Sequence, residues 1–357
     1  MIKPPFFVFL FFTVYSLAQS NAEIKDIDPE KPTLYIEFKN DTAASCLNIF
    51  VEDQFFTSYR YSSEDAKPFF YPVISPNGDV ITRRFPLEAK EGERADHPHQ
   101  VGCWFNFGNI NGIDFWNNSD SIPRELKDKY GIIVHEKFDS IFSGIQDAGF
   151  TENLIWQTNK GEILIKETTI FHFFASENIR RVDRVTSLKA IDEKVVIKDS
   201  KEGLFAIRLS REFEMPDNKP VSLTDKIGKP LPKKIQNNED LCGFYESSSG
   251  ITGKETWGTR NKWVTLSTIL NGDSITVGMC DHPDNINFPS YWMARHYGLF
   301  AINNFGMNVF SKYEPVYELS MSKGDRLILK HSLIIKSSGH LKTNEMEKVY
   351  QDFIMAY

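Results

Sequence analysis

Two histidines, His97 and His99, flank Pro98 in a stretch that also carries tryptophans and short amides. A residue before proline favours extended backbone, and residues i and i+2 of an extended chain point to one face. The spacing therefore predicts that both imidazoles serve one site. Histidine suits proton transfer there, because its unperturbed pKa of about 6.5 lies nearest neutrality. A core strand with two hydrogen-bonded histidines is the alternative interpretation.

A second loop repeats this pattern. Residues 281–283 have the same Asp-His-Pro order as residues 96–98, and a run with Trp292, Arg295, His296 and Tyr297 follows. Polar loops held by a rigid scaffold are common places for function. We therefore expect the two histidine loops to converge in one cleft.

The N-terminus has the features of a secretory signal peptide. Lys3 precedes an apolar run over residues 6–18, and small residues suitable for cleavage follow. The prediction is a signal peptide over residues 1–22 and a single catalytic domain over 23–357, exported to the periplasm. No later run approaches the length of about 18 apolar residues that a membrane helix needs.

Composition narrows the class of partner. The formal net charge is −7, from 41 lysines and arginines against 48 aspartates and glutamates. This argues against nonspecific nucleic-acid binding, which requires a basic face. It does not exclude an anionic substrate held locally by a few arginines.

Short alternating segments separated by Gly, Asn and Pro turns fill most of the chain. They predict an all-β fold, a large antiparallel β-sandwich with few short helices. Residues 262–270 and 274–279 form one expected hairpin, and residues 316–321 and 327–335 another. Only residues 343–356 have clear helical periodicity, which predicts a C-terminal helix.

Six ordered motifs resemble the bacterial family labelled "methane oxygenase PmoA-like". They are Lys-Pro-Phe-Phe-Tyr-Pro-Val at 67–73, Thr-Arg at 82–83, Asp-His-Pro-His at 96–99, the Asn-Gly/Asp-Phe-Trp run at 111–116, the Thr-Trp-Gly/Arg/Trp run at 256–263, and residues 281–298. The family is found among polysaccharide-degrading proteins, and the resemblance implies an oligosaccharide dehydratase acting on terminal uronic acids, as in ulvan breakdown. Where the family commonly has His-Arg before Gly102, this chain has Gln100 and Val101.

Removing water from a uronic acid requires a base for the C5 proton, a cation for the carboxylate and an acid for the departing hydroxyl. Histidine, arginine and tyrosine suit these roles. The candidate catalytic residues are His97, His99, His282 and Tyr297. The candidate substrate-binding residues are Arg83, Trp104, Trp257, Arg260, Trp292, Arg295 and His296.

Three alternatives remain open at this stage. His97, His99 and His282 together could hold a divalent cation with one open position. A glycoside hydrolase could use paired carboxylates among Asp96, Asp114, Asp281 and Asp284. A noncatalytic sugar-binding protein would need the tryptophans and not the histidines.

Overall fold

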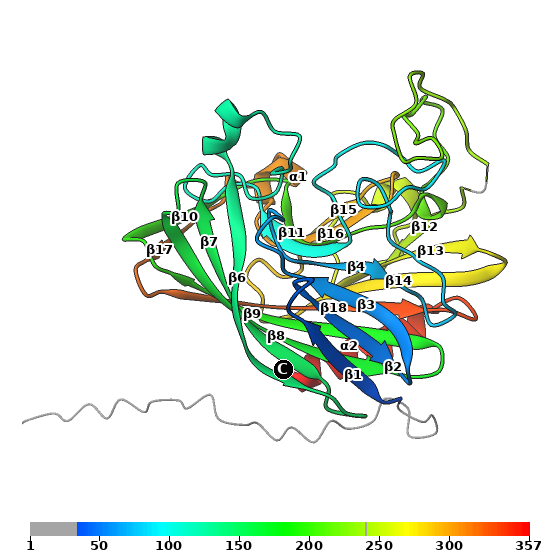
Figure 1. Ribbon diagram of the computed structural model, residues 1–357, viewed down its shortest axis with the longest axis horizontal. Helices are drawn as coiled ribbons and strands as arrows, with labels where there is room; N and C mark the ends of the chain where they lie inside the picture. Colours follow the sequence, from blue (N-terminus) through cyan, green and yellow to red (C-terminus); the bar gives the residue numbers. More distant parts are fainter. Residues whose placement is uncertain (1–33, 240) are drawn as a thin grey trace, which may run out of the picture.

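The expected β-sandwich is confirmed by a computed structural model, which describes residues 34–239 and 241–357 (Figure 1). The first sheet is antiparallel and eight-stranded. Its strands in spatial order are β1 (Ile36–Asp41), β2 (Cys46–Val51), β3 (Gln54–Arg60), β4 (Phe69–Val73), β5 (Cys103–Phe107), β11 (Gly203–Arg208), β16 (Leu299–Asn303) and β15 (Tyr291–Ala294).

The second sheet is also antiparallel and eight-stranded. Its order is β12 (Phe244–Ser247), β13 (Trp263–Leu270), β14 (Asp273–Asp281), β18 (Arg326–Lys336), β9 (Ile179–Ala190), β8 (Ile163–Ala175), β7 (Gly149–Thr158) and β6 (Gly131–Phe142). The helices are short except the last: α1 (Met307–Ser311), α2 (Thr343–Ala356), and the 3₁₀ turns η1 (Arg124–Lys129), η2 (Arg211–Phe213) and η3 (Gly253–Thr256).

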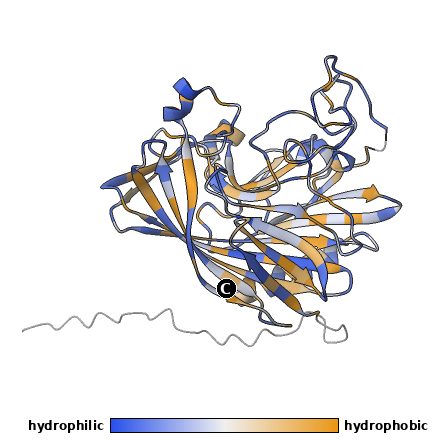
Figure 2. Ribbon diagram, in the orientation of Figure 1, coloured by the Kyte–Doolittle hydropathy of each residue, from blue (hydrophilic) through white to orange (hydrophobic). Residues whose placement is uncertain are grey.

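The inner faces of the two sheets form one core. Phe70 of the first sheet meets Phe171 of the second edge-on, with ring centroids 5.2 Å apart, and Tyr59 meets Phe150 at 5.3 Å. Alternate residues of every strand can join this core because side chains alternate between the two faces of a sheet. Figure 2 shows the hydrophobic residues concentrated on the strands, while the loop over residues 216–239 is largely hydrophilic.

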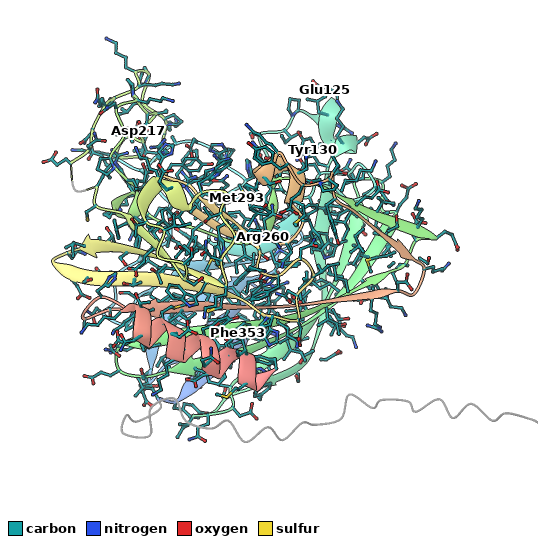
Figure 3. The ribbon with its side chains drawn as sticks, turned by 180° about the vertical axis from the view of Figure 1, so that it is seen from behind. Glu125, Tyr130, Asp217, Arg260, Met293 and Phe353 are labelled. Carbon is teal, nitrogen blue, oxygen red and sulfur yellow. The ribbon has the colours of Figure 1, made fainter. Side chains whose placement is uncertain are left out.

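Each outer face is covered differently. Helix α2 lies against the second sheet, where Met346, Tyr350 and Phe353 pack on Trp263 and Ile334 (Figure 3). The first sheet instead carries an apolar group of its own on its outer face, which includes Trp104, Trp116, Ala206, Met293 and Ala301. Leu87 and Tyr297, which belong to connecting segments, and Val309 of α1 pack against this group.

One predicted hairpin is confirmed and one is wrong. Strands β13 and β14 pair over their full length, with Leu270 opposite Asp273 across the Asn-Gly turn. The other two segments do form strands, but β17 (Glu318–Ser322) pairs with β10 (Lys194–Lys198) and β18 lies between β14 and β9. The turn at Gly324 therefore sends the chain into a different sheet.

Two expectations concern the membrane and the leader. No helix among the described residues is both long and apolar enough to span a bilayer. The predicted signal peptide, residues 1–22, lies outside the described residues.

Candidate active site

The His97 loop is a tight turn and not the extended segment that the proline suggested. The Gln100 amide donates to the His97 carbonyl at 3.0 Å, and His97 has φ +43°, in the left-handed region. The two imidazoles are perpendicular, with centroids 5.7 Å apart. His97 is exposed, whereas His99 is half-buried and lines a small cavity beside Lys67. The extended backbone from which a shared face was predicted is therefore absent.

Arg83 holds this turn together from below. Its guanidinium donates to the carbonyls of Arg94, Asp96, His97 and Gln100 and to the Asp96 carboxylate. The side chain is only 1% exposed. Arg83 therefore fixes the loop and leaves little of its fork to bind a substrate.

Asp96 is the acidic centre of the cluster. Its Oδ1 lies 2.9 Å from Arg83 Nη1 and 2.8 Å from Arg208 Nη2. Burial alone would raise the pKa of Asp96, but the charge of Arg208, the bond to His97 and the charge of Arg83 hold it well below its usual range. Asp96 is therefore a carboxylate at any physiological pH.

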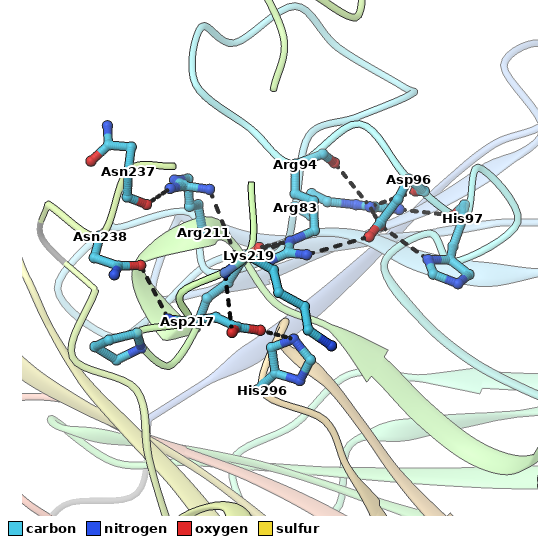
Figure 4. Close-up of polar contacts among 12 residues, drawn as sticks. Arg83, Arg94, Asp96, His97, Arg211, Asp217, Lys219, Asn237, Asn238 and His296 are labelled. Atoms are coloured by element: carbon cyan, nitrogen blue, oxygen red, sulfur yellow. Dashed lines mark hydrogen bonds and ion pairs between the residues drawn. The ribbon is translucent and has the colours of Figure 1, made fainter. Parts of the chain in front are cut away.

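His97 stands between this carboxylate and a tyrosine. Its Nδ1 lies 3.2 Å from Asp96 Oδ1 (Figure 4). Its ring stacks on Tyr297 with an interplanar angle of 7° and centroids 5.4 Å apart. The His97 side chain is 43% exposed. A carboxylate on Nδ1 fixes the tautomer that leaves Nε2 free to accept a proton.

Tyr297 belongs to the turn between β15 and β16. Arg208 lies over its ring at 4.6 Å from the centroid and Arg94 at 5.7 Å. Burial raises the pKa of Tyr297, while the charges of Arg208 and Arg295 oppose that rise. Next to it, His296 Nε2 lies 3.0 Å from Asp217 Oδ2, and this contact joins the loop over residues 216–239 to the turn (Figure 4).

Arg295 is the arginine of this cluster whose guanidinium has the fewest polar partners. It lies over the Trp257 ring at 4.9 Å from the centroid, and its Nε is buried without a hydrogen-bond partner. Among residues 34–239 and 241–357, no carboxylate lies within 4.0 Å of its nitrogens. Its charge is thus available to an anionic ligand.

Arg94, Arg208 and Glu214 belong to this cluster but were not among the residues predicted from the sequence. Arg94 forms a bidentate pair with Glu214 at 2.7 and 3.0 Å, and Arg208 bonds Gln100 as well as Asp96. Arg208 ends strand β11, which pairs with both β5 and β16. Arg208, a charged residue at the end of a buried strand, could have been noticed in the sequence. The sequence does not show which loop it contacts.

Three predicted substrate contacts are structural instead. Trp104 and Trp292 are buried, with indole nitrogens bonded to Asn106 and to the Asn261 carbonyl. The Arg260 guanidinium donates hydrogen bonds to the carbonyls of Pro289 and Asn287 and to the Glu314 carboxylate. Trp257, at 36% exposed, is the tryptophan of the predicted set that reaches the surface.

His282 does not join the cluster. It is buried against Phe353 of α2, ring to ring at 5.4 Å, on the outer side of the second sheet. Tyr297, in contrast, packs against the outer face of the first sheet. The sandwich separates His282 from His97, so these two histidines do not converge. The later part of the same run does reach the first loop, because Tyr297 stacks on His97. No three His, Cys, Asp or Glu side chains of the described residues are grouped closely enough to hold a metal, and the suggested three-histidine site is not assembled.

The other carboxylates considered for hydrolysis, Asp114, Asp281 and Asp284, have local hydrogen-bond or ion-pair partners. Asp114 accepts bonds from the amides of Trp116 and Asn117 in a local turn. Asp281 is fully buried among Asn285, Ser290 and Asn304, and Asp284 pairs with Lys330. Each of these carboxylates is thus bound by its own neighbours.

A family model matches residues 46–351, so the chain belongs to a family described as of unknown function, DUF6807. A search of curated protein sequences finds no relative. Solved structures with a distantly similar fold include the galactosidase domain of the alpha-galactosidase-sucrose kinase AgaSK, with 9% identity and TM-score 0.37. That match covers 85% of this chain and 42% of the other.

Two further structures are similar at the same level. For a GH36 alpha-galactosidase, AgaA, from Geobacillus stearothermophilus, the identity is 6%, the TM-score 0.32 and the coverage 89% and 42%. For the Slr1438 protein from Synechocystis sp. PCC 6803 these values are 8%, 0.29, 87% and 98%. The chain thus spans less than half the length of the two galactosidase chains. The likeness concerns the fold alone.

Proposed function

Taking the DUF6807 membership as given, we propose that this protein is an exported, periplasmic carbohydrate-active enzyme. Its reaction is the removal of water from the terminal uronic acid of an oligosaccharide. One observation carries the proposal: His97, oriented by Asp96, is stacked on Tyr297, and the charge of Arg295 acts on the same tyrosine. These are the base, acid and cation that the elimination requires.

The base in this proposal is His97. With Nδ1 directed to Asp96, Nε2 takes the C5 proton, which is acidic because it lies next to the carboxylate. Asp96 stabilises the imidazolium that forms, as an oriented carboxylate does in other base–carboxylate pairs. Arg83 and Arg208 keep Asp96 ionised, so it orients the ring without competing for the proton.

The cation is Arg295 and the acid is Tyr297. As the C5–H bond breaks, its electrons form the C4=C5 double bond, and the C4–O bond breaks. The Tyr297 hydroxyl gives its proton to that oxygen, which leaves as water. Arg208 over the ring stabilises the phenolate, which regains a proton as His97 loses its own to solvent. His296, held by Asp217, lies beside Tyr297 and suits contact with a substrate hydroxyl.

Incubation with oligosaccharides that end in glucuronic acid tests the proposal. The expected product has lost one water and absorbs in the near ultraviolet, because the new double bond is conjugated with the carboxylate. If the products are shorter sugars without that absorbance, the enzyme is a hydrolase and the elimination proposal is wrong. If the sugar binds but remains unchanged, the protein is a noncatalytic sugar-binding protein.

A further inference from the structure

A small cavity lies beside His99. Its volume is about 80 Å³, and its lining includes Lys67, His99, Phe69, Asp65 and Asp120. The His97 and His99 rings are 5.7 Å apart, so the cavity adjoins the proposed catalytic cluster. It belongs to none of the roles assigned above.

Lys67 brings a buried amine to this cavity. The residue is 3% exposed, its Nζ donates to the His99 carbonyl at 2.8 Å, and it lies 5.3 Å from the Trp104 ring centroid. Burial lowers the pKa of Lys67 to about 7, although the charges of Asp65 and Asp114 oppose that shift. An amine has further N–H donors beyond the one used here, and they remain available to a ligand.

His99 brings an acceptor and a donor. Its Nε2 is buried without a hydrogen-bond partner. Burial and then the positive charge of Lys67 lower the pKa of His99 to about 3, so the ring is neutral at physiological pH. A neutral imidazole offers one N–H and one unprotonated nitrogen. A buried polar atom without a partner is costly, which a ligand hydroxyl would relieve.

The charge around the cavity decides which ligand fits. Glu64, Asp65 and Asp120 line it, against the single amine of Lys67. This balance disfavours a carboxylate or a sulfate. Hydroxyl groups, which both donate and accept, match carboxylates, imidazole and amine at once. Phe69 adds an apolar surface of the kind that packs against sugar C–H groups.

We propose that this cavity is a subsite for the hydroxyl groups of an uncharged sugar unit, the one that adjoins the unit processed at His97. Its volume accommodates a few hydroxyls or a hydroxymethyl group and not a whole ring. The assignment of the cavity to the sugar next to the uronic acid rests on the proposed function. The binding chemistry does not, because it follows from Lys67, His99 and the three carboxylates.

The experiment compares wild type with Lys67→Met, which keeps the length of the side chain and removes the donors. Lys137→Met, at an exposed lysine of β6, is the matched control. The probe is a glucuronic acid disaccharide whose second unit is an uncharged sugar. We expect KM to rise about tenfold in Lys67→Met, the scale of one lost hydrogen bond in a buried site, with kcat within about twofold of wild type.

A second probe, the same disaccharide sulfated on its second unit, tests the charge argument. It should bind wild type at least about tenfold more weakly than the unsulfated one. Equal or tighter binding of the sulfated probe, or an unchanged KM in Lys67→Met, would overturn the subsite. If Lys67→Met does not fold, Asp120→Asn at the exposed rim makes the same test, with a weaker affinity for the unsulfated probe as the expected result.

Binding measured by calorimetry separates this inference from the proposed function. If wild type binds the unsulfated disaccharide without eliminating water and Lys67→Met loses the binding, the subsite stands and the dehydratase proposal fails. If elimination occurs and Lys67→Met binds the disaccharide as wild type does, the dehydratase proposal stands and the subsite fails. No binding by wild type also overturns the subsite.

Discussion

The two Asp-His-Pro loops have the same local sequence and opposite surroundings. His97 is half-exposed at the outer face of the first sheet, stacked on Tyr297 among several arginines. His282 is buried beneath α2 against Phe353. Burial lowers the pKa of His282, and the charge of Lys330 lowers it further. A solvent-facing imidazole can exchange protons with a substrate, whereas a buried imidazole contributes to the packing of the core.

The aspartates before the two histidines differ as much. Asp96 is paired with two arginines, which hold its pKa low against the effect of burial. Asp281 is surrounded by neutral donors, and burial raises its pKa to about 6 although the bonds from Asn285, Ser290 and Asn304 oppose the rise. The same triplet therefore has different chemistry in each place, because charge partners and burial decide how each group ionises.

The largest expected effect separates the two histidines. His97→Ala should lower kcat by about a hundredfold or more, the usual scale for loss of a general base. His282→Ala, its matched control in the other loop, should spare kcat in the protein that remains folded. Initial rates of the near-ultraviolet product, normalised to folded protein, check this. Equal losses in both variants would contradict the contrast between the loops.

The aspartates should differ in stability. Asp96→Asn leaves the buried guanidiniums of Arg83 and Arg208 without their carboxylate, which should cost about 3–5 kcal/mol of unfolding free energy. Asp281→Asn disturbs bonds from neutral donors and should cost about 1–3 kcal/mol. Urea denaturation measures both. A smaller loss for Asp96→Asn than for Asp281→Asn would mean that the two arginines are not held mainly by charge.

Two of the three arginines predicted to bind substrate, Arg295 and Arg260, should also differ in their effects. Arg295→Lys should lower kcat/KM about tenfold with little change in stability, because a point charge replaces a fork that can hold two carboxylate oxygens. Arg260→Lys is the control. Its fork is bound to carbonyls and Glu314, so stability should fall and kcat/KM should not. A loss of kcat/KM confined to Arg260→Lys would move the carboxylate site to that residue.

The smallest effect is on the pH dependence of stability. The folded pKa of Asp281 is about 6, above the unfolded value near 3.9, so the folded state binds more protons between these values. Its contribution is therefore present below about pH 4 and lost as pH rises through 6, by at most about 1.4 kcal/mol per pH unit. Asp96 acts oppositely: its low folded pKa stabilises above about pH 4 and that stability is lost on acidification.

Unfolding free energies measured from pH 3 to 7 in wild type and Asp281→Asn check this. The variant should lack the decline between about pH 4 and 6 and keep the loss below about pH 4 that Asp96 causes. A variant that follows the wild-type curve over the whole range would show that Asp281 does not titrate in that window.

Much of the fold followed from local patterns. Alternation predicted the strands, the Asn271–Gly272 turn predicted the β13–β14 hairpin, and helical periodicity predicted α2, whose bounds match at Thr343 and Ala356. These features depend on residues a few positions apart, which the sequence shows directly. The partner of β17 did not follow, because a Gly324 turn permits a hairpin but does not require one.

The site was recognised in part for the same reason. The sequence singled out His97, Arg295, His296, Tyr297 and Trp257 by residue type, and these lie at or beside one cluster in the structure. It could not show that Arg208 and Asp217 would meet them, since no local pattern records contacts between distant loops.

The amino-acid sequence alone determined which residues could transfer protons or bind anions, and which segments would be strands. The tertiary structure alone decided which of them meet water and which meet a charge. His97 and His282 share their neighbours in sequence, but one lies on a solvent-facing turn and the other under a helix. Long-range packing sets burial and charge pairing, and these two quantities set whether a titratable group is chemically available.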